Sequence, residues 1–121
     1  MLMANLLEDG LLLFNDGKYY EAHEAWEDLW RVTLDPRLKT CYQGLIQAAV
    51  GLHHLHRGNR VGAGSQLSKS MHNLSGPGGA LTTTLDIPDL IQQLAHILKT
   101  LPDRSGEPGG PAQPVRIARL K

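Results

Sequence analysis

The residues from Phe14 to Trp30 constrain the fold most, because they combine a tight turn with the start of an amphipathic helix. Asn15, Asp16 and Gly17 are typical turn residues. After this turn, a row of residues recurs at the spacing of one helical face. Both tryptophans of the chain lie in this row, so it is predicted to pack against the core. The row consists of Tyr19, Ala22, His23, Trp26 and Trp30.

Helical periodicity continues through the chain, and glycine and proline interrupt it. The pattern predicts helices at about residues 2–14, 18–33, 36–57, 60–74 and 87–100. Asp35 and Asp86 are suited to cap two of these helices, and a proline fits the first turn of each. We therefore expect an all-α fold: a compact bundle of about five helices, with two stacked helical hairpins and a closing helix.

The glycines inside the predicted helices suggest close contacts between helices. Gly10 weakens the first helix, but its bare Cα would let a neighbouring helix approach. Gly44 and Gly51 are one heptad apart on the same helix, beside a row of polar residues. The sequence therefore predicts close helix packing at these three positions.

Composition divides the chain into a domain and a tail. Residues 1–102 are long enough for one domain with its own core. Residues 103–121 are rich in proline and glycine, and we expect them to be flexible. The last residues, 115–121, alternate between apolar and basic types, and they could dock either on the body of the protein or on a partner.

Charge and cysteine content limit the partners and the location. The 12 basic and 12 acidic side chains give a net charge of zero, so neither nucleic acid nor an anionic membrane is expected as a partner. No apolar run approaches the roughly 18 residues of a membrane span, and the acidic start is not typical of a signal peptide. The single cysteine fits a reducing cytoplasm. The partner is expected to be a protein or a small molecule, and a homodimer is possible.

His23 and Glu27 are the main candidates for chemistry. They lie four residues apart on the predicted helix, so both side chains can reach one point. An imidazole and a carboxylate can together bind a divalent metal such as Zn, Mn or Fe. A third ligand would come from His53, His54 or His56 on the longest helix.

A buried hydrogen-bond network is the interpretation that we favour for these residues. Gln43, Gln47 and His54 form a row on the longest helix. This row is either a solvated face or the partner of His23 and Glu27, in which case it would fix the register of the two helices. Such polar groups need partners because burying them unpaired costs several kcal/mol. A metal site and a metal-free pocket remain as alternatives.

The longest motif resembles the signature of a family known as domain of unknown function 309. The matching stretches are Phe14-Asn15-x-Gly17-x-Tyr19-x-Glu21-Ala22-His23-Glu24-x-Trp26-Glu27-x-x-Trp30, then Gln43-Gly44-Leu45-Ile46-Gln47-x-Ala49, then Arg57-Gly58-Asn59-x-x-Gly62-Ala63. The resemblance implies a compact all-helical domain without an established activity. It also implies that one set of residues forms a functional or structural cluster: His23, Glu24, Glu27, Trp30, Gln43, Gln47 and Asn59.

Two functions follow as expectations. The first is a binding or scaffold module with a polar cluster between the second and third helices. The second is a small metal-dependent or acid–base enzyme, hydrolase-like, that uses His23, Glu24 and Glu27. A glycine-rich phosphate loop, a serine nucleophile elbow and a cysteine pair for zinc are all missing from the sequence.

Overall fold

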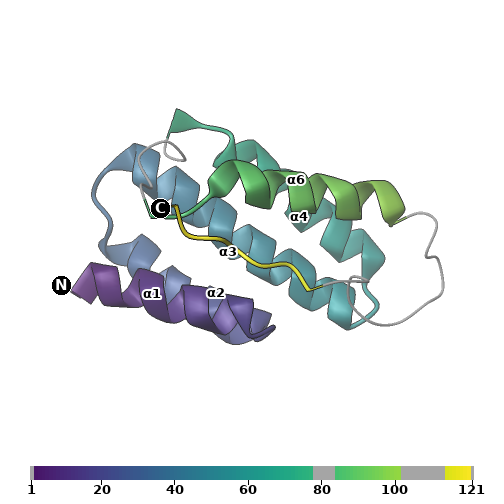
Figure 1. Ribbon diagram of the computed structural model, residues 1–121, viewed down its shortest axis with the longest axis horizontal. Helices are drawn as coiled ribbons and strands as arrows, with labels where there is room; N and C mark the ends of the chain where they lie inside the picture. The colour runs from purple at the N-terminus through teal and green to yellow at the C-terminus, as the bar shows by residue number, and fades with distance from the viewer. Residues whose placement is uncertain (1, 78–83, 102–113, 121) are drawn as a thin grey trace.

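The computed structural model describes residues 2–77, 84–101 and 114–120. Over these residues the protein is an all-α bundle, and the five predicted helices are confirmed with ends that differ by at most one residue (Figure 1). The helices are α1 (Leu2–Asn15), α2 (Tyr19–Val32), α3 (Pro36–His56), α4 (Arg60–Leu74) and α6 (Ile87–Thr100).

Local chemistry explains where the helices begin. The carboxylate of Asp35 accepts a hydrogen bond from the Arg37 amide at 2.9 Å, and Pro36 occupies the first turn of α3. Asp86 caps α6 in the same way. Between α1 and α2 the chain turns through Gly17, whose φ of 80° suits a residue without a Cβ. The helix boundaries are therefore set by residues next to them in sequence.

The bundle consists of two hairpins and a closing helix. The α1–α2 hairpin packs beside the α3–α4 hairpin, so that α3 lies between α2 and α4, and α6 packs on α4 (Figure 1). The core is apolar, with Trp26, Phe14 and Leu45 among its fully buried side chains. No side-chain nitrogen or oxygen that is buried in the described residues lacks a hydrogen-bond partner. This core holds the two hairpins together.

Glycines do permit the close helix contacts that the sequence predicted. A Cβ on Gly10 would fall on the indole ring of Trp26, which is fully buried and donates a hydrogen bond to the Leu7 carbonyl at 3.2 Å. A Cβ on Gly44 would lie 2.8 Å from Leu74, and one on Gly51 would lie 2.7 Å from Leu67. These two glycines therefore bring α3 close to α4.

Residues 114–120 are docked on the bundle in an extended conformation, between α1 and α6 (Figure 1). Val115 and Ile117 are buried, at 3% and 1% exposure. Of the alternatives that the sequence left open for residues 115–121, the structure shows docking on the body, because the apolar side chains enter the core and the backbone finds partners there. Residues 102–113 lie outside the described residues, and the division of the chain at residue 102 stays a prediction.

Candidate functional site

His23 and Glu27 lie at the rim of α2 and interact within that helix. The Nδ1 atom of His23 donates to the carbonyl oxygen of Tyr20. Because a carbonyl oxygen only accepts hydrogen bonds, Nδ1 must carry the proton. The Nε2 atom lies 3.9 Å from a carboxylate oxygen of Glu27, and the two side chains are 15% and 44% exposed. The imidazole is thus largely covered, whereas the carboxylate reaches the solvent.

The glutamine row of α3 does not meet these two side chains. The described hydrogen bond of Gln47 joins it to Asn73 on α4, with 2.7 Å between the amide nitrogen of Asn73 and the oxygen of Gln47. The predicted network between His23, Glu27 and the glutamines is not found among the interactions of the described residues. The reason is that Gly44 and Gly51 bring α4 against this side of α3, so Gln47 faces α4.

The histidines at the end of α3 have separate neighbours. His53 lies near α2, where the ring of Tyr20 is 5.1 Å from its own and 4.8 Å from that of His23. His54 instead lies 3.4 Å from the side-chain nitrogen of Asn59. Across the part of the chain that the structure describes, no three His, Cys, Asp or Glu side chains gather where they could hold a metal. The predicted metal ligands are therefore not brought together.

The remaining predicted residues lie elsewhere. Glu24 is exposed on α2. Asn59 caps α4, where its side-chain oxygen accepts a hydrogen bond from the Gly62 amide at 2.9 Å. Asn59 therefore has a structural role that explains its place in the motif.

Acid is expected to weaken the fold through His53. Burial, followed by the nearby charges of Arg57 and the other histidines, lowers the pKa of His53 from its ordinary value of 6.5. Protons then bind more readily to the unfolded chain, so stability falls as the pH drops through about 6.5 and below. We expect His53→Gln to reduce the fall in unfolding midpoint between about pH 7.5 and pH 5.5.

The matched control for this experiment is His72→Gln, because His72 is exposed on α4. Urea denaturation followed by circular dichroism at both pH values would measure the effect. Equal acid sensitivity in wild-type protein and the His53→Gln variant would contradict the prediction.

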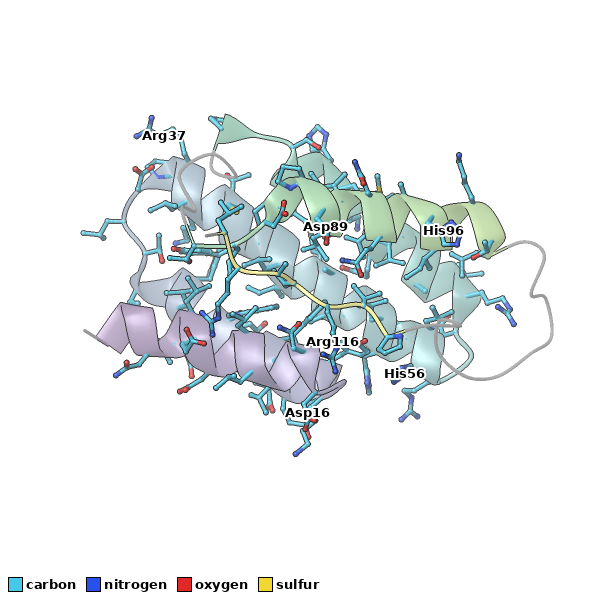
Figure 2. The ribbon with its side chains drawn as sticks, viewed as in Figure 1. Asp16, Arg37, His56, Asp89, His96 and Arg116 are labelled. Atoms are coloured by element: carbon cyan, nitrogen blue, oxygen red, sulfur yellow. The ribbon has the colours of Figure 1, made fainter. Side chains whose placement is uncertain are left out.

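An open hollow lies at the other end of α3. Arg37 and His56 mark the two ends of this helix in Figure 2. The hollow has a volume of about 370 Å³ and is lined by residues of α2, α3 and α4. The Lys39 ammonium lies 4.0 Å from the ring centroid of Trp30, over its face. We call this surface the Trp30 hollow; it is lined by Trp30, Pro36, Lys39, Thr40, Gln43 and Asn73.

The Trp30 hollow unites only two members of the predicted cluster, Trp30 and Gln43. Leu34, which lies between Trp30 and Pro36 in the sequence, is 94% exposed. An aromatic ring, an amide and a cation on an open surface are suited to binding another molecule. None of the six lining residues is a carboxylic acid or a histidine, and Lys39 is the one with a titratable side chain.

Charge is segregated along the chain, although the net charge is zero. Seven of the 12 acidic side chains lie between Glu8 and Asp28, where Lys18 is the only basic residue. Between Pro36 and Leu74 there are five Lys or Arg residues and no Asp or Glu. The α3–α4 hairpin, which provides five of the six residues of the hollow, is therefore basic. The net charge of zero, from which the expected partners were inferred, does not reveal this segregation.

The residues that hold residues 114–120, which we call the closing segment, were not predicted from the sequence. The side-chain oxygen of Asn15 accepts from the Ile117 amide at 2.8 Å, and its nitrogen donates to the Ile117 carbonyl at 3.0 Å. Gln93 makes the same pair of bonds with Arg116, at 3.2 and 2.7 Å. The hydroxyl of Tyr19 donates to the Val115 carbonyl at 3.5 Å, and Glu8 accepts from Arg119. We call this surface the tail site; it consists of Glu8, Asn15, Tyr19 and Gln93. The sequence indicated only a turn role for Asn15.

Comparison with known proteins confirms the resemblance. The model of the family described as Domain of unknown function (DUF309) matches residues 7–65. An uncharacterized protein of Aquifex aeolicus is 41% identical over 56 residues, which are 46% of this chain and 17% of that protein. The uncharacterized protein YpuF of Bacillus subtilis is 36% identical over 56 residues, which are 46% of this chain and 32% of YpuF. The matched part thus spans a third or less of each relative.

The helices were also compared with the dimensions of a bilayer. Within residues 2–77, 84–101 and 114–120, none of the helices has the length and hydropathy that crossing a membrane requires.

Proposed function

We propose that this chain, which matches the DUF309 family over residues 7–65, is a protein-binding module that docks its partner at the Trp30 hollow. The observation that carries this proposal is the Lys39 ammonium over the face of the Trp30 ring, in a hollow that is open to solvent. Aromatic residues on open surfaces are frequent anchors of protein interfaces. Binding at this surface requires no catalytic group.

The chemistry of the hollow suggests the kind of partner. Trp30 and Pro36 offer apolar surface to an apolar or aromatic side chain. Lys39, on a hairpin without acidic residues in its helices, favours a carboxylate next to that side chain. Asn73 is already bonded to Gln47, so this part of the lining is ordered before binding, which lowers the entropic cost of docking. The partner that fits best is a protein segment with an apolar anchor and a neighbouring acid.

The alternative of a small enzyme has less support. His23 and Glu27 are a pair on one helix with the carboxylate in solvent, and Glu24 is exposed. The imidazole of His54 faces Asn59. We also propose a cytoplasmic location, which the presence of only one cysteine supports.

A small acid can test the proposed docking surface. The probe is 3-phenylpropionate, which joins an aromatic ring to a carboxylate, and its uncharged amide is the matched control ligand. In a titration followed by backbone amide chemical shifts, we expect the acid to perturb the residues of the Trp30 hollow with weak affinity. The amide should bind about threefold to fivefold more weakly, because a surface ion pair contributes about 1 kcal/mol or less.

Variants distinguish the hollow from the alternative site. Lys39→Met keeps much of the apolar stem and removes the charge, so it should abolish the preference for the acid over the amide. His23→Ala should leave the affinity unchanged. Shifts centred on His23 and Glu27, or a loss of binding in His23→Ala alone, would contradict the proposal.

A further inference from the structure

We propose that the tail site recognises an extended peptide, and that the closing segment of a second copy of this chain can occupy it, so that two chains exchange residues 114–120. This interaction uses the surface between α1 and α6 and is separate from the Trp30 hollow. In Figure 2, Arg116 marks the segment that occupies the site in the single chain.

The backbone of the segment is held in the way that a neighbouring β-strand would hold it. Asn15 and Gln93 each bond both the amide and the carbonyl of one residue, and the two residues are adjacent, Ile117 and Arg116. Backbone bonds of this kind provide affinity in strand-addition complexes and do not depend on the side chains of the peptide. The two amide side chains therefore make this surface a receptor for extended backbone.

Side chains of the segment provide the specificity. Val115 and Ile117 are buried, whereas Arg116 and Ala118 between and after them are exposed. Arg119 makes a two-pronged ion pair with Glu8, which holds the pKa of Glu8 below its ordinary value. The site thus requires apolar residues at the positions of Val115 and Ile117 and a basic residue at the position of Arg119. The residue between the two apolar ones can be of any type.

The connection to the bundle permits exchange. Twelve residues, 102–113, separate Leu101 from Pro114, and a chain of this length spans roughly 40 Å when fully extended. Because the segment is covalently joined to its own bundle, it competes with any free peptide for its own site. A second copy offers the same segment, so the exchanged segment would make the same contacts at the tail site, which is the usual basis of domain swapping.

Two complementary full-length variants test this proposal. Ile117→Asp places a charge where a buried side chain docks, so it prevents the closing segment from binding but leaves the tail site intact. The double variant Asn15→Ala, Gln93→Ala removes the side-chain hydrogen bonds of the tail site but leaves the closing segment intact. Each variant alone should be monomeric in sedimentation velocity. Their mixture should form a complex of twice the mass, because the segment of the second variant enters the site of the first.

A peptide with the sequence of residues 113–121 is the second probe. It should bind Ile117→Asp at least tenfold more tightly than the wild-type chain, whose own segment competes. The same peptide carrying Ile117→Asp is the control and should not bind. If the Ile117→Asp chain is unfolded by itself, the peptide should restore its helical circular dichroism signal.

Three results would overturn the proposal. The first is a mixture of folded variants that stays monomeric. The second is a peptide that binds wild-type protein and Ile117→Asp equally well. The third is an unfolded Ile117→Asp chain that neither the peptide nor the second variant restores.

Discussion

Replacing Trp26 with alanine is expected to lower the free energy of unfolding by about 3–5 kcal/mol. The indole is fully buried and its ring centroid lies 5.5 Å from that of Phe14. Truncation would leave a cavity between α1 and α2, and the Leu7 carbonyl would lose the hydrogen bond that it accepts from the indole. Urea denaturation followed by circular dichroism would measure the change.

Trp30→Ala is the matched control for this prediction. Trp30 is the other tryptophan of α2, but its ring is only partly buried and lines the open hollow. Its truncation should cost clearly less than that of Trp26. A loss below about 1 kcal/mol for Trp26→Ala would contradict the packing of α2, since deletion of a core aromatic residue costs several times more.

Replacing Gly10 with alanine should destabilise the protein by about 3 kcal/mol, near the upper end for overpacking of a core. The added methyl group would overlap the buried indole of Trp26. Because the indole is a rigid ring held by a hydrogen bond, α1 would have to move away from α2. Thermal and urea denaturation would both report the loss.

Gly64→Ala is the control for the overpacking. Gly64 is also inside a helix, but the nearest atom to its added Cβ would be 3.7 Å away, on Leu101. Alanine there should stabilise the protein by about 0.5–1 kcal/mol through helix propensity. If Gly10→Ala were as well tolerated as Gly64→Ala, the close contact between α1 and α2 would be wrong.

A double mutant isolates the contact itself. In the Trp26→Ala background the methyl group of Gly10→Ala enters the space that the indole vacated. Its cost should therefore be smaller than in the wild-type background, and the difference is the coupling energy between the two positions. A cost that is unchanged by the loss of the indole would mean that Gly10 is needed for another reason.

The helices could be predicted because the signals that define them are local. Asp35 with Pro36 and Asp86 with Pro88 mark the starts of helices, and the apolar row through Trp26 identifies the buried face of α2. Gly10 indicated a close approach without showing which helix would approach. Periodicity defines a face of a helix, but it does not identify the helix that covers this face.

This limit explains why the partner of Gln47 was not predicted. Gln43 and Gln47 were correctly placed on one row of α3, and two glycines beside them suggested close packing. The helix that approaches Gln47 is α4, where Asn73 is its partner, whereas Gln43 lies in the hollow that also contains Trp30 of α2. Whether α2 or α4 packs against Gln47 depends on how the whole core is packed. The spacing of residues within one helix does not contain this information.

The tail site was beyond sequence reasoning for a different reason. Asn15 and Ile117 are separated by 102 positions, and the alternating segment is too short to distinguish a docked strand from a loose tail. Asn15 is also a good turn residue, so its local role was a sufficient explanation of its presence. Only the folded structure shows that Asn15 and Ile117 are in contact.

The most direct test of the proposed function is a titration of the protein with 3-phenylpropionate, followed through its two indole N–H signals. Trp30→Phe assigns the signals, since one of the two disappears. We predict that the Trp30 signal moves with the probe concentration while the Trp26 signal stays in place. Movement of the Trp26 signal alone, or of neither signal, would contradict docking at the Trp30 hollow.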